Sequence, residues 1–312
     1  MTGKINGVYA ATIVPLNQDR SIDINELSDH LIDISKKKSL RGVLINGHAG
    51  ENHILTKEEQ INIVKITREI VPKNFKIVSG LNFEDSNIAS SVADKMISNG
   101  ADSIMIFPPF SWSIAYDHHL IINHHKIISK NIDFPIMLYQ ASIAAGNLTY
   151  NTETLKNLID IKQVVAIKEG SWETSKYEEN RKIIKNLRPE IAVMASGDEH
   201  LMSCFTVGTE GSLVSLAIII PDIILNLYDA IKKKNFQKAL KYHNKIYPLA
   251  KAIYGFPPSS HATARLKTCL KMLGKIKNDK MRSSINSLNK NDINNLKSAL
   301  TLSGLQIKNH II

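Results

Sequence analysis

Short apolar runs alternate with amphipathic helical patterns through the first 230 residues of this 312-residue chain, and the alternation occurs eight times. Runs such as Lys76–Leu81 and Ser103–Phe107 have the length of buried strands, whereas the segment 24–34 repeats apolar residues at helical spacing. Eight strand–helix units favour an α/β fold, a closed (β/α)8 TIM barrel, over an open doubly wound sheet. The absence of a Gly-x-Gly-x-x-Gly or phosphate-loop motif also disfavours a nucleotide-binding sheet.

From about residue 230 the pattern is helical, without further strands. Ala239–Leu249, Ala262–Leu273 and Asn291–Leu302 read as amphipathic helices. No flexible linker separates them from the preceding units. We therefore expect a barrel over residues 1–230 that holds the active site, and a C-terminal helical extension over residues 231–312 packed on it.

The charge balance and the apolar runs exclude several classes of protein. The formal net charge is +10, but the two tight lysine runs, 36–38 and 232–234, each close a helical segment and carry no interleaved aromatic residues. We therefore expect anionic small-molecule substrates and no nucleic acid. The longest apolar run, Leu213–Ile224, is too short and too interrupted to span a membrane. Together with Cys204 and Cys269, which fit core thiols, this leads us to expect a cytoplasmic protein.

One predicted strand carries a lysine at its end. The run Val164–Ile167 is apolar and reads as a strand buried on both faces, and it is followed by Lys168 and then by a Gly-Ser turn. A lysine at the end of a barrel strand can point into a cavity, where loss of solvent favours its neutral form. A neutral amine attacks a carbonyl carbon and forms a Schiff base. The alternative is a lysine that has simply reached the surface where its strand stops.

Other polar features fall at the same end of the predicted barrel. Active sites of TIM barrels lie at the carboxyl ends of the strands. Tyr139 ends the fifth strand, Gly47-His48-Ala49-Gly50-Glu51 follows the second, and Ser196-Gly197-Asp198 follows the seventh. A tyrosine can carry protons, and a glycine-bounded turn lets the main chain approach a carboxylate. These residues predict carbonyl chemistry on an anionic substrate.

This constellation resembles the dihydrodipicolinate synthase / N-acetylneuraminate lyase family of class I aldolases over nearly the whole chain. The matching segments, in chain order, are Gly47–Glu51, Tyr139, Ile167–Glu169 and Ser196–Asp198. The resemblance implies a TIM barrel with a helical extension, a homotetramer built as a dimer of dimers, and no metal or organic cofactor. It also implies a Schiff base between Lys168 and pyruvate or another 2-oxo acid, with Tyr139 as the proton shuttle. The implied substrate-binding residues are Gly47, His48, Ala49, Gly197 and Leu213.

Three departures from the synthase of lysine biosynthesis bear on the substrate. His48 and Ala49 stand where that synthase usually has two threonines, and Phe110 stands where it has a tyrosine supplied by the neighbouring subunit. The segment Gln140–Gly146 offers no arginine to hold the carboxylate of the aldehyde. These losses argue against dihydrodipicolinate synthesis, whereas the carbonyl chemistry needs only Lys168 and Tyr139.

Several side chains allow two interpretations. His48 could relay protons or bond a substrate hydroxyl, or it could merely orient its turn. Glu51 fits a structural carboxylate that accepts turn amides better than a general base. The pairs His118-His119 and His124-His125 lack the i, i+4 spacing of helical metal ligands, which disfavours a metal-dependent aldolase. Phe110 and Trp112 lie in a loop that either reaches the cavity or packs against another subunit.

Three functions remain open at this point. The first is a Schiff-base lyase or aldolase that joins or cleaves a 2-oxo acid and an aldehyde, or dehydrates a deoxy sugar acid. The second is 4-hydroxy-tetrahydrodipicolinate synthase. The third is a barrel that senses a 2-oxo acid without turnover, although a pure binder would need neither Lys168 nor Tyr139.

Overall fold

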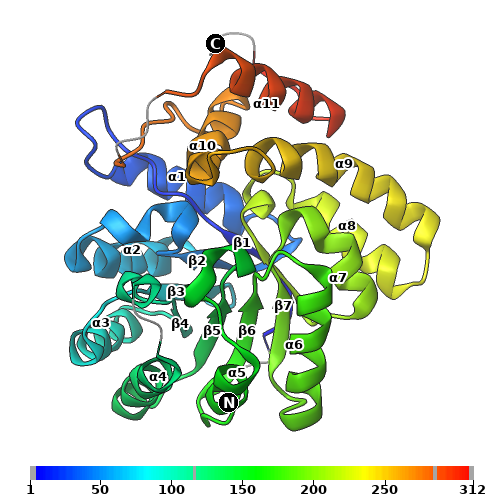
Figure 1. The fold of residues 1–312 in the computed structure, drawn as a ribbon. Coiled ribbons are helices and arrows are strands. Elements are labelled where there is room, and N and C mark those ends of the chain that lie inside the picture. The colour runs from blue at the N-terminus through cyan, green and yellow to red at the C-terminus, as the bar shows by residue number, and fades with distance from the viewer. Residues whose placement is uncertain (1–4, 115–116, 284–286, 309–312) are drawn as a thin grey trace.

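The chain folds as a closed barrel of eight parallel strands in the computed structural model, which describes residues 5–114, 117–283 and 287–308. Each strand pairs with the next, and the first pairs with the eighth (Figure 1). The predicted (β/α)8 TIM barrel is therefore confirmed. The strands are β1 (Gly7–Ala11), β2 (Leu40–Ile45), β3 (Lys76–Leu81), β4 (Ser103–Ile106), β5 (Ile136–Gln140), β6 (Val164–Glu169), β7 (Ala192–Ala195) and β8 (Gly211–Val214).

Helices surround the barrel, one after each strand. They are α1 (Ile24–Ser35), α2 (Lys57–Ile70), α3 (Ser86–Ser98), α4 (His118–Ile132), α5 (Thr152–Ile159), α6 (Thr174–Leu187), α7 (Leu201–Val207) and α8 (Pro221–Lys232). The start of α2 illustrates why they form where they do. Thr56 accepts a hydrogen bond from the Glu59 amide, and Glu59 accepts one from the Thr56 amide, so the predicted capping box is present.

Some boundaries differ from the sequence prediction. The apolar run from Gly7 continues to Leu16, but β1 ends at Ala11, and the eighth strand ends at Val214 because the 3-10 helix η6 (Ser215–Ile218) begins there. Apolar residues outside strands are buried in the same core, so hydrophobicity alone does not mark where pairing stops.

Alternation along the strands separates two cores. Ile167 faces the outer core between strands and helices, whereas Ala166 belongs to the inner core of the barrel. Lys168, two residues after Ala166, therefore lies on the inward face at the carboxyl end of β6. Tyr139 follows inward-facing Met137 in the same way on β5. The period of two thus directs both side chains into the mouth of the barrel.

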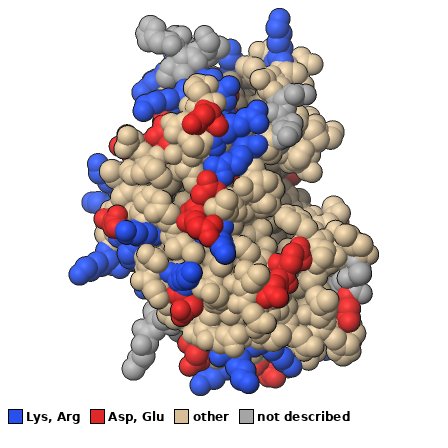
Figure 2. All heavy atoms as spheres, turned by 90° about the vertical axis from the view of Figure 1, so that its left-hand side faces the viewer, with Lys and Arg blue, Asp and Glu red and all other residues tan. Residues whose placement is uncertain are grey.

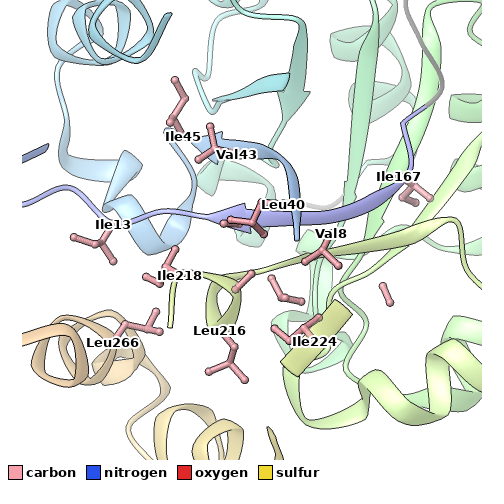
Figure 3. Close-up of a cluster of buried hydrophobic side chains, with 14 of the residues drawn as sticks. Val8, Ile13, Leu40, Val43, Ile45, Ile167, Leu216, Ile218, Ile224 and Leu266 are labelled. Carbon is pink, nitrogen blue, oxygen red and sulfur yellow. The ribbon is translucent and has the colours of Figure 1, made fainter. Parts of the chain in front are cut away.

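Three further helices follow the barrel: α9 (Phe236–Tyr254), α10 (Ala262–Met272) and α11 (Lys290–Leu302). They gather along one side of the barrel (Figure 1). Figure 3 shows the outer core, in which Leu266 of α10 lies among barrel residues such as Ile13 and Leu216. The helical tail therefore shares a core with the barrel, while a domain boundary at residue 230 stays a prediction.

The lysine runs and the two cysteines lie where the sequence analysis predicts them. Lys36 caps α1 and Lys232 ends α8, so the lysine runs close helices as predicted. On the face shown in Figure 2, basic side chains are interspersed with acidic ones. Cys204 and Cys269 are buried free thiols. Within the described ranges, no helix combines the length and apolarity needed to cross a membrane.

A buried ion pair joins the tail to the turn after β2. Lys267 of α10 lies 2.7 Å from a carboxylate oxygen of Glu51, and the two side chains are 1% and 3% exposed. Glu51 also accepts hydrogen bonds from the amides of Arg282 and Ser283, at 2.9 and 3.1 Å. The structural interpretation of Glu51 fits these contacts, although the amides belong to the tail and not to its own turn.

We expect Lys267→Met to lower the free energy of unfolding by about 3–5 kcal/mol, because it leaves the Glu51 carboxylate buried without its cation. The matched control is Lys271→Met, which removes a lysine one turn later whose partner Asp279 is 32% exposed. That change should cost less than about 1 kcal/mol. Urea titrations of the two variants measure both values, and equal losses would contradict the assignment.

Candidate active site

Lys168 and Tyr139 are neighbours at the mouth of the barrel. Strands β5 and β6 pair so that Tyr139 stands directly opposite Lys168. The Lys168 Nζ lies 5.3 Å from the centre of the Tyr139 ring. Both side chains are half-buried and line one cavity. An amine and a phenol thus lie close together in a space that a small molecule can enter.

The surroundings raise the neutral fraction of the Lys168 amine, although the charged form still prevails at pH 7. Loss of solvent lowers the pKa of Lys168 to about 8, while the nearby carboxyl of Asp198 opposes this shift. Asp198 is 4% exposed, and burial raises its pKa to about 7, against the effects of the Leu216 amide and Lys168. Burial also raises the pKa of Tyr139 to about 12, so its hydroxyl holds its proton at neutral pH. The site therefore contains a weakly basic amine and a protonated phenol.

His48 begins the 3-10 helix η1 (His48–Gly50), directly after β2. Its ring lies 4.5 Å from that of Phe107 and 5.4 Å from that of Tyr139, between ring centres. Desolvation, and to a lesser degree the charge of Lys168, lower the pKa of His48, although its surface faces the open cavity. A neutral imidazole can hydrogen-bond to a substrate, and it can accept a proton on its free ring nitrogen, so a binding or relay role for His48 stays a prediction.

The cavity has a volume of about 540 Å³ and is formed by both the barrel and the tail. Its lining includes the predicted residues Lys168, Tyr139, His48 and Ala49. The other described lining residues are Ala11, His53, Phe110, Trp172, Ser196, Asp198, Ser215, Tyr254, Ser259, Ser260, Ala262, Thr263 and Leu266. A volume of this size suits a small-molecule substrate.

Three predicted substrate-binding residues lie beside the cavity and not in its lining. Gly47 caps the start of η1, and Gly197 caps the start of the 3-10 helix η5 (Asp198–His200). Leu213 is fully buried in the inner core, opposite Tyr9. The glycines can therefore shape the turns that bear His48 and Asp198, whereas Leu213 supports the floor of the barrel.

The tail supplies lining residues that the sequence did not point to. Ser259, Ser260 and Thr263 precede or begin α10, and the Thr263 hydroxyl lies 3.4 Å from the carbonyl oxygen of His48. No local motif marks these residues, since they reach the cavity only through the packing of the tail. Trp172 offered a weak signal, because it follows the strand of Lys168 closely.

The second histidine pair of α4, His124-His125, has structural partners. His124 Nδ1 lies 2.8 Å from the Ser86 hydroxyl, and His125 Nδ1 lies 2.8 Å from the Ile121 carbonyl oxygen. Trp112 is buried, with its ring centre 5.5 Å from that of His124, whereas Phe110 reaches the cavity. Residues 5–114, 117–283 and 287–308 contain no cluster of three or more His, Cys, Asp or Glu side chains suited to a metal.

Comparison with known sequences places this chain in a family. The sequence profile of the Dihydrodipicolinate synthetase family matches residues 4–303, which is nearly the whole chain.

The chain belongs to the dihydrodipicolinate synthetase family.

Relatives within the dihydrodipicolinate synthetase family carry two kinds of name. An uncharacterized DapA-like lyase of Thermococcus onnurineus is 27% identical, over 86% of this chain and 89% of its own. A 4-hydroxy-tetrahydrodipicolinate synthase of Protochlamydia amoebophila is 25% identical, over 80% of this chain and 82% of its own. The family membership is thus clear, while the names divide between a general and a specific activity.

Solved structures agree on the fold. A dihydrodipicolinate synthase from Thermotoga maritima superposes with a TM-score of 0.88 and 20% identity, covering 97% of this chain and 100% of its own. A monomeric dihydrodipicolinate synthase variant has a TM-score of 0.85 and 21% identity, over 97% of this chain and 98% of its own. The barrel and its helical tail are therefore the architecture of this family.

We expect the reactivity of Lys168 to titrate with a pKa near 8. At pH 7 an amine with this pKa is neutral in about 9% of molecules, against about 0.03% for a pKa of 10.5. The rate of attack on a carbonyl compound should therefore rise with pH and level off above pH 8. Timed borohydride trapping with subsaturating pyruvate, followed by intact mass measurement, gives this rate.

Asp198→Asn provides the matched variant for this titration. The charge of Asp198 raises the pKa of Lys168. Removal of that charge should therefore let the trapping rate reach its plateau at a lower pH. A rate that still rises between pH 9 and 10 in the unmodified protein would show an ordinary lysine and contradict the prediction.

Proposed function

We propose that this protein is a lyase that forms a Schiff base between Lys168 and pyruvate or another 2-oxo acid, and that it cleaves or forms a C–C bond with an aldehyde. The observation that carries the proposal is the Lys168 amine. It lines the cavity, its pKa is lowered to about 8, and it stands opposite Tyr139. Relatives named as lyases and as synthases support an enzyme of the lyase class.

The chemistry follows from these two groups. The neutral nitrogen of Lys168 adds to C2 of the 2-oxo acid, and loss of water leaves a protonated C=N bond. Loss of a proton from C3 gives an enamine, whose carbon attacks the aldehyde; cleavage runs through the same bonds in reverse. Tyr139 carries protons to and from the reacting oxygen atoms, and hydrolysis of the C=N bond restores the free amine. Dehydration of a deoxy sugar acid would use the same C=N bond as an electron sink.

The turn after β2 is suited to the carboxylate of the 2-oxo acid. The amides of Gly50 and Glu51 close η1 by bonding to the carbonyl oxygens of Gly47 and His48. The first amides of a helical turn have no partner within that turn, and they favour anions. We propose that the main chain at His48 and Ala49 holds this carboxylate, with neither metal nor organic cofactor required.

Reductive trapping tests the proposal. Incubation with pyruvate and borohydride should add the mass of a reduced pyruvyl group to the chain, and peptide mapping should place it on Lys168. Incubation with borohydride alone is the control. Absence of an adduct, or an adduct elsewhere, would rule out the mechanism. An adduct without turnover of any aldehyde would favour the alternative that the barrel senses a 2-oxo acid without catalysis.

4-Hydroxy-tetrahydrodipicolinate synthase is the second candidate, favoured by the name of the Protochlamydia relative. The cavity lining contains Lys168 but, in the described part of the chain, no arginine. A coupled assay with aspartate semialdehyde separates the two candidates. Clear turnover of this aldehyde would make the second one right.

We also propose a homotetramer, in line with the family resemblance, and a cytoplasmic location. Exposed apolar side chains near the cavity support a subunit contact: Phe110, Ile114 and Ile143 are 48%, 87% and 41% exposed. Phe110 lies in the 3-10 helix η3 (Phe110–Ser113), and Ile114 directly follows that helix. Ile143 begins the 3-10 helix η4 (Ile143–Leu148), which contacts η3. Because a monomeric variant shares the fold, light scattering must decide. A mass four times that of one chain is expected, and Ile114→Lys should reduce it.

A further inference from the structure

We propose that the aldehyde used by this enzyme is uncharged and bears hydroxyl groups. This inference rests on the proposed function and names the class of its second substrate. It follows from the side chains that line the part of the cavity left over once a 2-oxo acid occupies Lys168.

The charges of the cavity disfavour a second carboxylate. Among its described lining residues, the only Lys or Arg side chain is Lys168 itself, which the C=N bond occupies during the reaction. The only carboxyl group among these described lining residues is that of Asp198, which is 4% exposed. An aldehyde with a carboxylate would lose its water there without gaining a counter-ion, and it would approach an acidic group. The cavity therefore selects against anionic aldehydes.

Hydroxyl groups have partners in the same space. The cavity is lined by the hydroxyl side chains Ser196, Ser215, Ser259, Ser260 and Thr263. One oxygen of Asp198 accepts a hydrogen bond from the Leu216 amide at 3.1 Å, and a carboxyl has a second oxygen that can accept one from a substrate. A substrate with several hydroxyls can exchange its water for these groups.

Two aromatic rings form a wall beside these hydroxyls. The ring centres of Trp172 and Tyr254 are 5.2 Å apart, and the Tyr254 hydroxyl is hydrogen-bonded to Ser215. Trp172 has a φ of 63°, a left-handed conformation that is unfavourable for a bulky residue and that the surroundings must enforce. A rigid aromatic face next to hydroxyl donors suits the C–H face and the hydroxyl edge of a short hydroxyaldehyde.

The experiment uses the full chain with excess pyruvate and three aldehydes. Glyceraldehyde is uncharged and hydroxylated, succinic semialdehyde is anionic, and benzaldehyde is uncharged without a hydroxyl group. Mass spectrometry of the condensation products gives kcat/KM for each. We expect the value for glyceraldehyde to exceed that for succinic semialdehyde by roughly 100-fold, because the anion lacks a buried partner.

A charge placed in the outer wall should change this preference. Ser259 and Ser260 are exposed at the cavity rim, so Ser259→Arg and Ser260→Arg should fold normally. Either variant should move the ratio of the two kcat/KM values toward succinic semialdehyde by about 10-fold or more, since arginine binds a carboxylate with two hydrogen bonds. Gln237→Arg, on the exposed surface of α9, adds the same charge away from the cavity and should leave the ratio unchanged.

The outcomes separate this inference from the proposed function. The pyruvyl adduct on Lys168 is measured first, without an aldehyde. If it forms but succinic semialdehyde or benzaldehyde is the better acceptor, or glyceraldehyde is not joined at a measurable rate, the inference is wrong while the Schiff base stands. An equal shift of the ratio by Gln237→Arg would also overturn it. If no adduct forms, the proposed function fails and the inference fails with it.

Discussion

Lys168→Ala should abolish the pyruvyl adduct and reduce turnover by about 10⁴-fold or more, because no other amine side chain lies among the described residues that line the cavity. Lys168→Arg should fail equally, since a guanidinium stays protonated at all accessible pH values. Trapping with borohydride and initial rates of pyruvate release or consumption measure the two effects. A variant that kept wild-type turnover would place the nucleophile elsewhere.

The loss should be chemical and not structural. Lys182→Ala is the control, since this lysine is exposed on α6, the helix that follows the lysine-bearing strand β6. It should leave both adduct and rate unchanged. Lys168→Met should also raise the midpoint of thermal unfolding. The folded state disfavours the charged amine, so below pH 8 the lysine costs stability that a neutral side chain does not.

Tyr139→Phe should lower kcat by about 10²–10⁴-fold, the usual contribution of a positioned acid–base group. Its ring centre lies 4.6 Å from that of Phe107, and phenylalanine keeps this packing. The protein should therefore stay folded and still form some pyruvyl adduct, but it should turn over slowly. Initial rates, adduct yield and thermal unfolding distinguish these effects.

Tyr177→Phe is the matched control for loss of a buried phenol hydroxyl. The Tyr177 hydroxyl donates a hydrogen bond to the Gly208 carbonyl oxygen at 2.8 Å, outside the cavity lining. Its removal should cost about 1 kcal/mol of stability and leave kcat unchanged. If both tyrosine variants lost activity to the same degree, Tyr139 would have no special role in proton transfer.

The barrel and the orientation of its two candidate catalytic side chains could be predicted because both depend on local periodicity. Strand alternation places Lys168 and Tyr139 inward, and eight repeats close the sheet. The match of Ser196–Asp198 to a family motif also indicates Asp198, whose carboxyl group lines the cavity with the amine. Each of these signals lies within a few residues of the position it predicts.

The remainder of the site depends on contacts between distant segments. Ser259 and Thr263 reach the cavity through the packing of α10 against the turn of His48, which no spacing in the sequence encodes. Leu213 shows the same dependence: the family resemblance implies a place at the cavity, its side chain lies in the inner core opposite Tyr9, and its role in substrate binding stays a prediction. Which of two neighbouring layers a residue joins depends on the depth of each strand in the barrel.

Residues of both the barrel and the C-terminal tail line the cavity, and this has a consequence for synthesis of the chain on the ribosome. Lys168 is translated about ninety residues before the Ser259–Thr263 segment that lines the same cavity. Until that segment emerges and docks, the space around Lys168 lacks its outer wall. The desolvation that lowers the pKa of Lys168 is then incomplete, so we expect the amine of a nascent chain to titrate closer to the ordinary pKa of a lysine.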